Sequence, residues 1–293
     1  MGAAAVDWVA RVEDMPPLDG ISFAVQYTSF PGGSGGNVAE GLARLGHTVC
    51  FLGLLGDDEG GRMLLQAFES AGVDISCIRI VKDQRSAACF IAVDRLGQRM
   101  IFSLGGVAVC DRVEDIASAE LDRAKILFIA DAYQEIAHAA ISRLGPAGRV
   151  VFNPGGLMVA SGLNGLRPIL DRTDLLILSR VEAETLTGVT GPEQAYKILV
   201  DIGPKAVLLT LGENGVLVFD GKRSTLIPAM PVEHLVDTTG AGDAFSAGVI
   251  AGLLEGTTLE QAVRLGCAVS AYKIQYFGSR NGLPDRAEIQ SWL

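Results

Sequence analysis

The sequence contains few histidines, and its cysteines follow no recognisable pattern. Only three histidines, His47, His138 and His234, occur in 293 residues, and they lie far apart. A histidine-based metal site or a Ser/His/Asp triad is therefore poorly supported. The five cysteines are scattered, odd in number and without C-x-x-C spacing. This pattern indicates reduced, mostly buried thiols and predicts a cytoplasmic protein.

Long apolar runs and clusters of positive charge are also absent. No apolar run reaches the roughly 20 residues that a membrane-spanning helix needs, and no signal-peptide pattern is visible at the N-terminus. The formal net charge is −10, without Lys/Arg clusters. We therefore expect no membrane and no nucleic acid as partners. A phosphate-bearing ligand stays compatible with this charge, because backbone N–H groups and Mg²⁺ can hold it.

The second part of the chain predicts a parallel sheet. The length and the 49% hydrophobic content allow one large α/β domain or two small ones. From about residue 112, apolar strand patterns alternate with helical ones, which favours a parallel sheet with helices on both faces. The strands are expected at 125–130, 149–153, 174–178, 205–210 and 215–219. Ligands bind at the carboxyl ends of such strands. At those ends lie Asp131, Asn153, Glu182, Glu184, Thr210 and Gly212.

The first part of the chain carries shorter strand patterns. Residues 1–13 and 21–30 are predicted strands, and 87–94 with 99–104 form a hairpin. The hairpin and residues 21–30 can together build a small separate sheet. A buried strand is expected at 48–55, a helix at 62–71, and ordinary connections at 74–83 and 278–284. Asp7 interrupts the first strand, either at a solvent-facing end or reaching into a site.

A glycine-rich stretch from Val236 to Gly248 carries the strongest chemical signal. Its Gly240-Ala241-Gly242 segment leads into a predicted helix at 244–254, where unpaired N–H groups and the helix dipole attract anions. Glycines let the backbone approach a phosphate closely. Asp243 follows in the first helical turn, where a carboxylate can take the proton of a hydroxyl that attacks the phosphate. An acidic residue is also common at a plain helix N-terminus, so this motif alone leaves both readings open.

A second glycine loop runs from Pro31 to Asn37 and opens a short helix that stops at Gly46. A loop of this kind is again a cradle for an anion or ligand. It does not match the dinucleotide fingerprint G-x-G-x-x-G, because Val38 stands where the third glycine belongs. A nicotinamide cofactor is therefore not expected.

The two glycine loops, in this order and with Thr210-Leu-Gly-Glu-Asn-Gly215 between them, resemble the ribokinase (PfkB-type) carbohydrate kinase family over essentially residues 1–293. The Walker motif of P-loop enzymes is absent. The resemblance implies a single kinase domain with a three-layer α/β/α ribokinase-like fold, a mainly parallel central sheet and a small β-sheet lid at about 8–30 and 84–104. It also implies transfer of the γ-phosphoryl of ATP, with Mg²⁺, to a hydroxyl of a small carbohydrate.

The resemblance assigns roles to individual residues. The catalytic set is Asp243 as the base, with Gly240, Ala241 and Gly242 as the anion hole. The substrate-binding set is Asp7, Gly32, Gly33, Asn37 and Asp131. The nucleotide-binding set is Thr210, Gly212, Gly215 and Glu184. Glu184 would also hold Mg²⁺ through water, and a monovalent cation such as K⁺ would lie at Asp237 and Thr239, beside the loop 278–282.

Three departures from the family pattern bear on these expectations. The family's N-x-x-E motif, tied to Mg²⁺ and phosphate, corresponds here to Val181 through Glu184, with valine in place of the amide. Ser34 stands where ribokinases proper carry a lysine, which weakens ribose as the specific substrate. Family members also usually have several apolar residues before the Gly2 equivalent, so the start is expected to be truncated or misassigned.

Several functions are compatible with these residues. A neutral sugar is the first choice as acceptor, and a nucleoside is the alternative within the same family. A sugar phosphate would call for basic residues in the lid, for which Arg85, Arg95 and Arg99 are candidates. A catalytically weak sugar or nucleotide sensor is a different class, motivated by Val181 and opposed by the intact Asp243. Lid strands of the family often pair across a homodimer, which the apolar residues at 87–93 and 100–104 allow.

Overall fold

A six-stranded sheet forms the centre of the molecule in this computed structural model, which describes residues 1–292, Leu157 through its backbone only. The strand order is β12-β11-β10-β9-β8-β7. The four strands β7 to β10 are parallel, whereas β11 and β12 pair antiparallel at one side. The strands are β7 (Ile126–Ile129), β8 (Arg149–Phe152), β9 (Leu175–Ser179), β10 (Ala206–Thr210), β11 (Val216–Phe219) and β12 (Ser224–Ile227).

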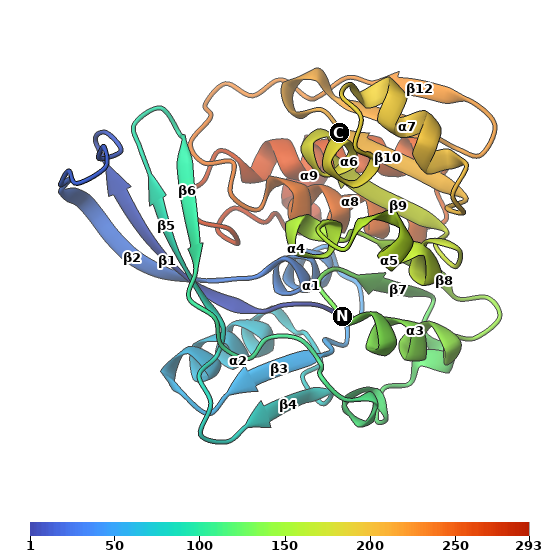
Figure 1. The fold of residues 1–293 in the computed structure, drawn as a ribbon, viewed down its shortest axis with the longest axis horizontal. Coiled ribbons are helices and arrows are strands. Elements are labelled where there is room, and N and C mark those ends of the chain that lie inside the picture. Colours follow the sequence, from blue (N-terminus) through green and yellow to red (C-terminus); the bar gives the residue numbers. More distant parts are fainter. Residues whose placement is uncertain (293) are drawn as a thin grey trace.

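Helices cover both faces of this sheet, as Figure 1 shows. Successive side chains of a strand point to opposite faces, so Leu176 and Leu178 enter one apolar core while Leu175 and Ile177 enter the other. The first core is closed by α3 (Gln134–Ser142), α4 (Gly155–Val159), α5 (Gly162–Leu170), α6 (Arg180–Thr187) and α7 (Pro192–Val200). The second is closed by α1 (Ser34–Arg44), α8 (Ala241–Leu254), α9 (Leu259–Lys273) and α10 (Arg286–Gln290).

A third apolar cluster lies under the first strands of the chain. Helix α2 (Glu59–Ala71) packs there on the short parallel pair of β3 (Gly53–Gly56) and β4 (Ile78–Val81). The strand expected at 48–55 is therefore shorter, with residue 50 contributing only an isolated bridge. The expectation of a plain connection at 74–83 was wrong, because β4 lies inside it. Helices α5, α9 and α10 and strand β12 were not expected from the sequence.

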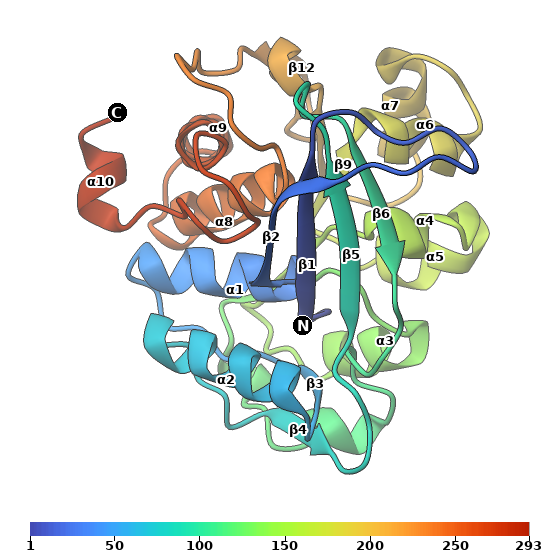
Figure 2. The same ribbon diagram turned by 90° about the vertical axis from the view of Figure 1, so that its left-hand side faces the viewer.

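The hairpin and residues 21–30 form a small sheet as predicted, and the first strand of the chain, β1, lies between them. In the order β2-β1-β5-β6 these strands form what we call the lid sheet, which projects from the body of the molecule in Figure 1 and is seen face on in Figure 2. Residues 5 and 7 of its strand β1 are buried toward the central sheet, whereas Trp8 is exposed on the other face. The lid sheet consists of β1 (Ala5–Val12), β2 (Ala24–Gly32), β5 (Ala88–Val93) and β6 (Arg99–Ser103).

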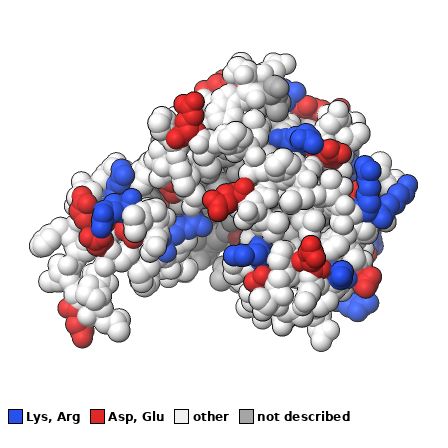
Figure 3. Space-filling view, turned by 90° about the horizontal axis from the view of Figure 1, so that it is seen from above, with Lys and Arg blue, Asp and Glu red and all other residues white. Residues whose placement is uncertain are grey.

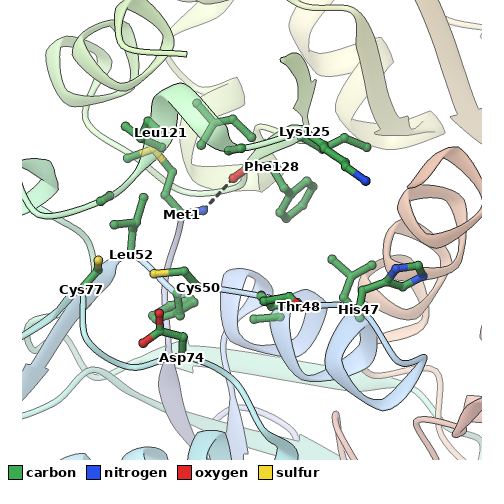
Figure 4. A pocket seen from close by; sticks show the side chains of 18 of the residues that line it. Met1, His47, Thr48, Cys50, Leu52, Asp74, Cys77, Leu121, Lys125 and Phe128 are labelled. Atoms are coloured by element: carbon green, nitrogen blue, oxygen red, sulfur yellow. Dashed lines mark hydrogen bonds between the residues drawn. The ribbon is translucent and has the colours of Figure 1, made fainter. Parts of the chain in front are cut away.

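The first two residues join the two sheets of the body. The Met1 ammonium donates to the Phe128 carbonyl of β7 over 2.6 Å, and the Gly2 N–H donates to the Leu52 carbonyl over 3.3 Å. Beside Met1 lies a cavity of about 900 Å³ between residues 48–52 and 125–128. Figure 4 shows the ammonium group at its edge. Burial lowers the pKa of this amino group to about 6.

An added strand should fill this cavity. Residues placed before Met1 would run alongside β7, because Met1 already pairs with it. We expect a four-residue Val-Ile-Val-Ile extension to raise the melting temperature by roughly 2–4 °C, the shift that about 1 kcal/mol produces in a chain of this size. Differential scanning calorimetry would measure it, with an Asp-Pro-Asp-Pro extension as the control. Equal melting temperatures for both variants would show that the cavity does not accept a strand.

Candidate active site

A cleft of about 1830 Å³ lies between the lid sheet and the carboxyl ends of the central strands. Five of the six polar or glycine residues predicted at those ends line it, namely Asp131, Asn153, Glu182, Thr210 and Gly212. The lid sheet adds Asp7, Cys89, Arg99 and Ile101, and the early glycine loop adds Gly33 and Ser34. The cleft therefore brings together segments from nearly the whole length of the chain.

The late glycine loop forms the floor of the cleft at the start of α8. Gly240 is the N-cap residue with φ +77°, and the helix begins at Ala241, three residues earlier than expected. The Ala241 N–H donates to the Thr238 carbonyl over 3.1 Å. Among the described residues, the N–H groups of Gly242 and Asp243 have no such partner. These two groups, together with the positive end of the helix dipole, form an anion site.

Glycine is needed at positions 240 and 242 for different reasons. A Cβ on Gly240 would lie 2.5 Å from the Ser279 carbonyl oxygen, and its backbone is left-handed, so the fold itself requires glycine there. A Cβ on Gly242 would meet no atom within 4 Å. Gly242 also lines the cleft. The absence of its side chain therefore serves a ligand and not the packing of the protein.

Gly242→Ala should weaken binding of ATP, the nucleotide that the family resemblance implies, while leaving the fold intact. The added methyl would occupy space beside the free N–H groups, and we expect the KM for ATP to rise roughly tenfold, about 1.4 kcal/mol. The melting temperature should not fall, because alanine in a helix is favoured over glycine. Steady-state kinetics and a thermal melt would test this. An unchanged KM would place the phosphates elsewhere in the cleft.

Asp243 lies partly buried at the start of α8 and is held by one side chain of the early glycine loop. The Asn37 amide donates to its Oδ2 over 2.7 Å. Burial raises the pKa of Asp243 to about 7, with the charges of Asp131 and Asp7 adding to the rise and the Asn37 hydrogen bond opposing it. A carboxylate whose pKa lies near neutrality is suited to act as a general base.

Arg280 fixes Asn37 from behind and was missed in the sequence, where it falls within an expected plain connection. Its guanidinium, only 3% exposed, donates to Asn37 Oδ1 over 2.9 Å, to Glu40 over 3.2 Å and to the Gly32 carbonyl over 2.7 Å. Because the Asn37 Oδ1 atom accepts from Arg280, its amide nitrogen must face Asp243. A buried arginine thus sets the orientation of the side chain that contacts the base.

Two more carboxylates face the cleft. Asp7 accepts a 2.9 Å hydrogen bond from the Ser279 hydroxyl, and burial raises its pKa. Burial also raises the pKa of Asp131 to about 6. Each can accept hydrogen bonds from ligand hydroxyls, which is the chemistry by which polyols are recognised.

The glycines of the early loop make room for these charged groups. A Cβ on Gly32 would collide with the Asp7 carboxylate, and one on Gly36 would collide with the Arg280 guanidinium. Gly33, at φ +85°, packs against the backbone of residues 3–5 and lines the cleft. Gly32 and Gly36 therefore allow polar groups to be buried close to the backbone, whereas Gly33 lines the cleft.

Of the four residues expected to bind the nucleotide, two line the cleft. Thr210 and Gly212 line it. Gly215 does not, and its backbone instead closes the turn onto Leu211 over 2.8 Å. Glu184 is also outside, because it points away along α6 and accepts the Gly191 N–H over 3.0 Å. The expectation that Glu184 faces the ligand was wrong.

Val181 and Glu184 were expected to correspond to the N-x-x-E motif, but the pair that lines the cleft with both members is Ser179 and Glu182. Two residues separate Ser179 from Glu182, as in the N-x-x-E motif. They form a capping box at the start of α6, in which Glu182 Oε2 accepts the Ser179 N–H over 2.7 Å. Both line the cleft. The capping-box spacing was the sequence signal for this pair. Val181, 64% exposed, lies between them.

Asp237 and Thr239 lie beneath the anion site. Asp237 is buried, and its two carboxylate oxygens accept the N–H groups of Thr239 and Gly278, each over 2.8 Å. The Thr239 hydroxyl accepts from Arg99 over 3.2 Å, which links the lid sheet to the anion loop. Of the three lid arginines considered from the sequence, Arg99 alone lines the cleft.

Within residues 1–292 no helix is long and apolar enough to cross a membrane, and no cluster of three His, Cys, Asp or Glu side chains could hold a metal ion by itself. On the face shown in Figure 3, acidic and basic side chains are interspersed and form no extended basic patch.

Comparison with known proteins identifies the family. The model of the pfkB family carbohydrate kinases matches residues 1–286. An uncharacterized sugar kinase of Archaeoglobus fulgidus is 33% identical over 251 residues, which cover 83% of this chain and 98% of that protein. The crystal structure of Thermotoga maritima ribokinase superposes with a TM-score of 0.87 at 28% identity, covering 99% of this chain and 97% of that one.

A second solved structure shows ligands. Arabidopsis thaliana ribokinase, complexed with ribose and ATP, superposes with a TM-score of 0.85 at 26% identity, covering 99% of this chain and 96% of that one. The ribokinase-like α/β fold expected from the sequence is thereby confirmed. The chain belongs to the pfkB family of carbohydrate kinases and is a phosphotransferase with an alcohol group as acceptor.

Proposed function

We propose that the protein transfers the γ-phosphoryl group of ATP to a hydroxyl of a neutral sugar, with Asp243 as the general base. The observation that carries this proposal is the position of Asp243 at the N-terminus of α8, where the same turn offers free N–H groups to a phosphate. A base with a pKa near 7 beside an anion site is the arrangement that phosphoryl transfer to a hydroxyl requires.

The two ends of the cleft would hold the two substrates. Asp7 of the lid sheet, the backbone at Gly33 and Asp131 after β7 line the cleft, where their oxygens can accept hydrogen bonds from sugar hydroxyls. Thr210 and Gly212 lie at the end of β10, further along the same edge of the central sheet, and would contact ATP. The Gly242 and Asp243 N–H groups lie between them and would stabilise the charge on the transferred group.

The residues present fit Mg²⁺ bound together with a nucleotide. Mg²⁺ in kinases is usually held by one or two carboxylates and by the substrate phosphates, not by a cage of protein ligands. Glu182 supplies one such carboxylate in the cleft, and its Oε1 has no partner among the described residues. When bound there, the ion would neutralise charge on the phosphates. Arg99 and the lid sheet would close over the acceptor and keep water from competing with it.

A panel assay tests the proposed activity. ADP release would be measured with ATP, Mg²⁺ and one acceptor at a time, drawn from neutral sugars, sugar phosphates and nucleosides. We expect a neutral sugar to give the highest kcat/KM. A nucleoside as the best acceptor would move the protein to the nucleoside kinases of the family. Binding without ADP release for every acceptor would indicate a sensor.

A phosphorylated sugar is the second candidate acceptor, favoured by Arg99. Its guanidinium lines the cleft on the lid side and has no carboxylate within 4 Å among the described residues. Arg99→Met separates the two candidates, because it should raise the KM of a sugar phosphate strongly and that of a neutral sugar only slightly.

The rate should depend on pH through Asp243. The base acts only when deprotonated, so kcat/KM should rise about tenfold per pH unit below the pKa of about 7 and level off above it. A pH–rate profile with a neutral sugar would measure this. A profile flat between pH 5 and 8 would contradict the raised pKa of Asp243.

We further propose a homodimer formed through the outer face of the lid sheet. Trp8 stacks on Tyr27 there with ring centroids 5.9 Å apart, and Phe90 packs on Phe102 at 6.3 Å. Met100 on the same face is 48% exposed. Analytical ultracentrifugation should find a dimer for the wild type and a monomer for Trp8→Glu. A monomeric wild type would exclude this interface.

A further inference from the structure

Lys273, the last residue of α9, is a buried cation that the reaction scheme above does not use. Its side chain is fully inaccessible to solvent. The ammonium group donates to the Asp237 carbonyl over 3.2 Å and lies 3.5 Å from the Tyr276 carbonyl oxygen. Its hydrogen-bond partners among the described residues are these two carbonyls, and none of the ion pairs there includes it. Two backbone carbonyls from different segments thus converge on one positive charge.

This environment lies where the family resemblance implies a monovalent cation. Backbone carbonyl oxygens are the ligands by which proteins hold K⁺. Here the Asp237 carbonyl is taken by the Lys273 ammonium, and both Asp237 carboxylate oxygens accept backbone N–H groups. The Thr239 hydroxyl accepts from Arg99. The residues therefore do not fit a separately bound K⁺, because their acceptor atoms are engaged and a cation is already present.

The ammonium group lies between two segments that shape the anion site. Asp237 directly precedes the Thr238–Gly242 turn, and Tyr276 precedes the turn at Gly278 and Ser279. These segments are in contact, because the Gly278 N–H donates to Asp237 and the Ser279 backbone packs against Gly240. A charge that draws the two carbonyls together holds the anion loop in the shape that leaves the Gly242 and Asp243 N–H groups free.

We propose that Lys273 is a built-in monovalent cation, a positioning residue whose ammonium group replaces K⁺ beneath the anion loop and makes the kinase independent of added K⁺. The proposal rests on the kinase function proposed above. It assigns Lys273 no contact with substrate, so its effect must pass through the Asp237–Gly240 segment.

Cation rescue tests this role. In buffers whose only monovalent cation is tetramethylammonium, wild-type activity should be unchanged by adding K⁺ or NH₄⁺. Lys273→Ala should lose activity roughly tenfold or more, since small displacements of positioning groups have effects of that size or greater. K⁺ or NH₄⁺ should restore part of this loss. Lys273→Met, which keeps most of the side-chain volume without the charge, should lose activity and show no rescue.

A thermal melt without substrates provides a second readout that does not need kinase activity. K⁺ should raise the melting temperature of Lys273→Ala and leave that of the wild type unchanged relative to tetramethylammonium. Strong activation or stabilisation of the wild type by K⁺ would overturn the proposal. A Lys273→Ala variant that loses activity and stability without any cation rescue would also overturn it, because the lysine would then serve packing alone. If no acceptor is phosphorylated by the wild type, the melts still decide the role of Lys273.

Discussion

Asp243→Asn is expected to lower turnover by at least roughly a hundredfold and to leave ATP binding nearly unchanged. The amide cannot take a proton from the acceptor hydroxyl, yet it has nearly the shape of the carboxylate, and its oxygen can still accept from Asn37. The N–H groups that would hold the phosphate belong to the backbone, so they remain in place. Initial-rate kinetics and ATP titration by calorimetry would measure the two quantities.

The same variant should be at least as stable as the wild type above neutral pH. The pKa of Asp243 rises from 3.8 to about 7 on folding. Its contribution to stability is therefore fully present below pH 3.8 and is lost as the pH rises through about 7, where a buried charge must form. Asparagine carries no such charge. Asp131→Asn is the matched control, since it should raise the KM of the sugar more than it lowers turnover. Retained turnover in Asp243→Asn would refute its role as base.

Arg280→Met should destabilise the protein by about 3 kcal/mol, the lower end of the effect of breaking a buried ion pair. Glu40, which is 8% exposed in its side chain, would lose its buried partner and keep only the bond to Arg44, whose side chain is 44% exposed. The Gly32 carbonyl and Asn37 Oδ1 would lose their donor. Chemical denaturation would measure the change in the free energy of unfolding.

A double variant separates charge from packing in this cluster. Arg280→Met combined with Glu40→Leu removes both buried charges, and such replacements are often neutral or stabilising. We expect the double variant to regain most of the lost stability but not the activity, because Asn37 would still be free to turn away from Asp243. Equal stability of the single variant and the wild type would show that the ion pair contributes little.

The sequence predicted the cleft well because its signals are local. The Gly240–Asp243 segment marks a helix start by its own residues, and the polar residues after each strand must meet at one edge of a parallel sheet. The assignment of Glu184 failed because a local motif does not say which side of a helix faces the cleft. The choice between Glu182 and Glu184 depends on that side of α6. The capping box of Ser179 with Glu182 fixes the start of α6 and turns Glu182 toward the cleft. In the sequence, this capping-box pattern overlaps with the N-x-x-E motif, and the two suggest different glutamates.

Long-range contacts were not predictable from one chain. Arg280 lies 243 residues from Asn37, and nothing near it marks it as the partner of a loop at the other end of the sequence. The burial of Lys273 was not predictable either. A lysine at the end of a helix is usually solvated, and here its burial depends on the turn that follows. Strand β4 was missed because its polar flanks resemble a loop and its pairing with β3 crosses a whole helix.

Transfer of phosphate to a hydroxyl, with Asp243 as base, is tested most directly by ³¹P NMR of ATP, Mg²⁺ and the sugar that gives the fastest ADP release. With the wild type, a phosphomonoester resonance of the sugar should grow at the rate at which ATP is consumed, and with Asp243→Asn it should be nearly absent over the same time. Release of inorganic phosphate in place of the sugar phosphate, or an equal rate with the variant, would contradict the mechanism.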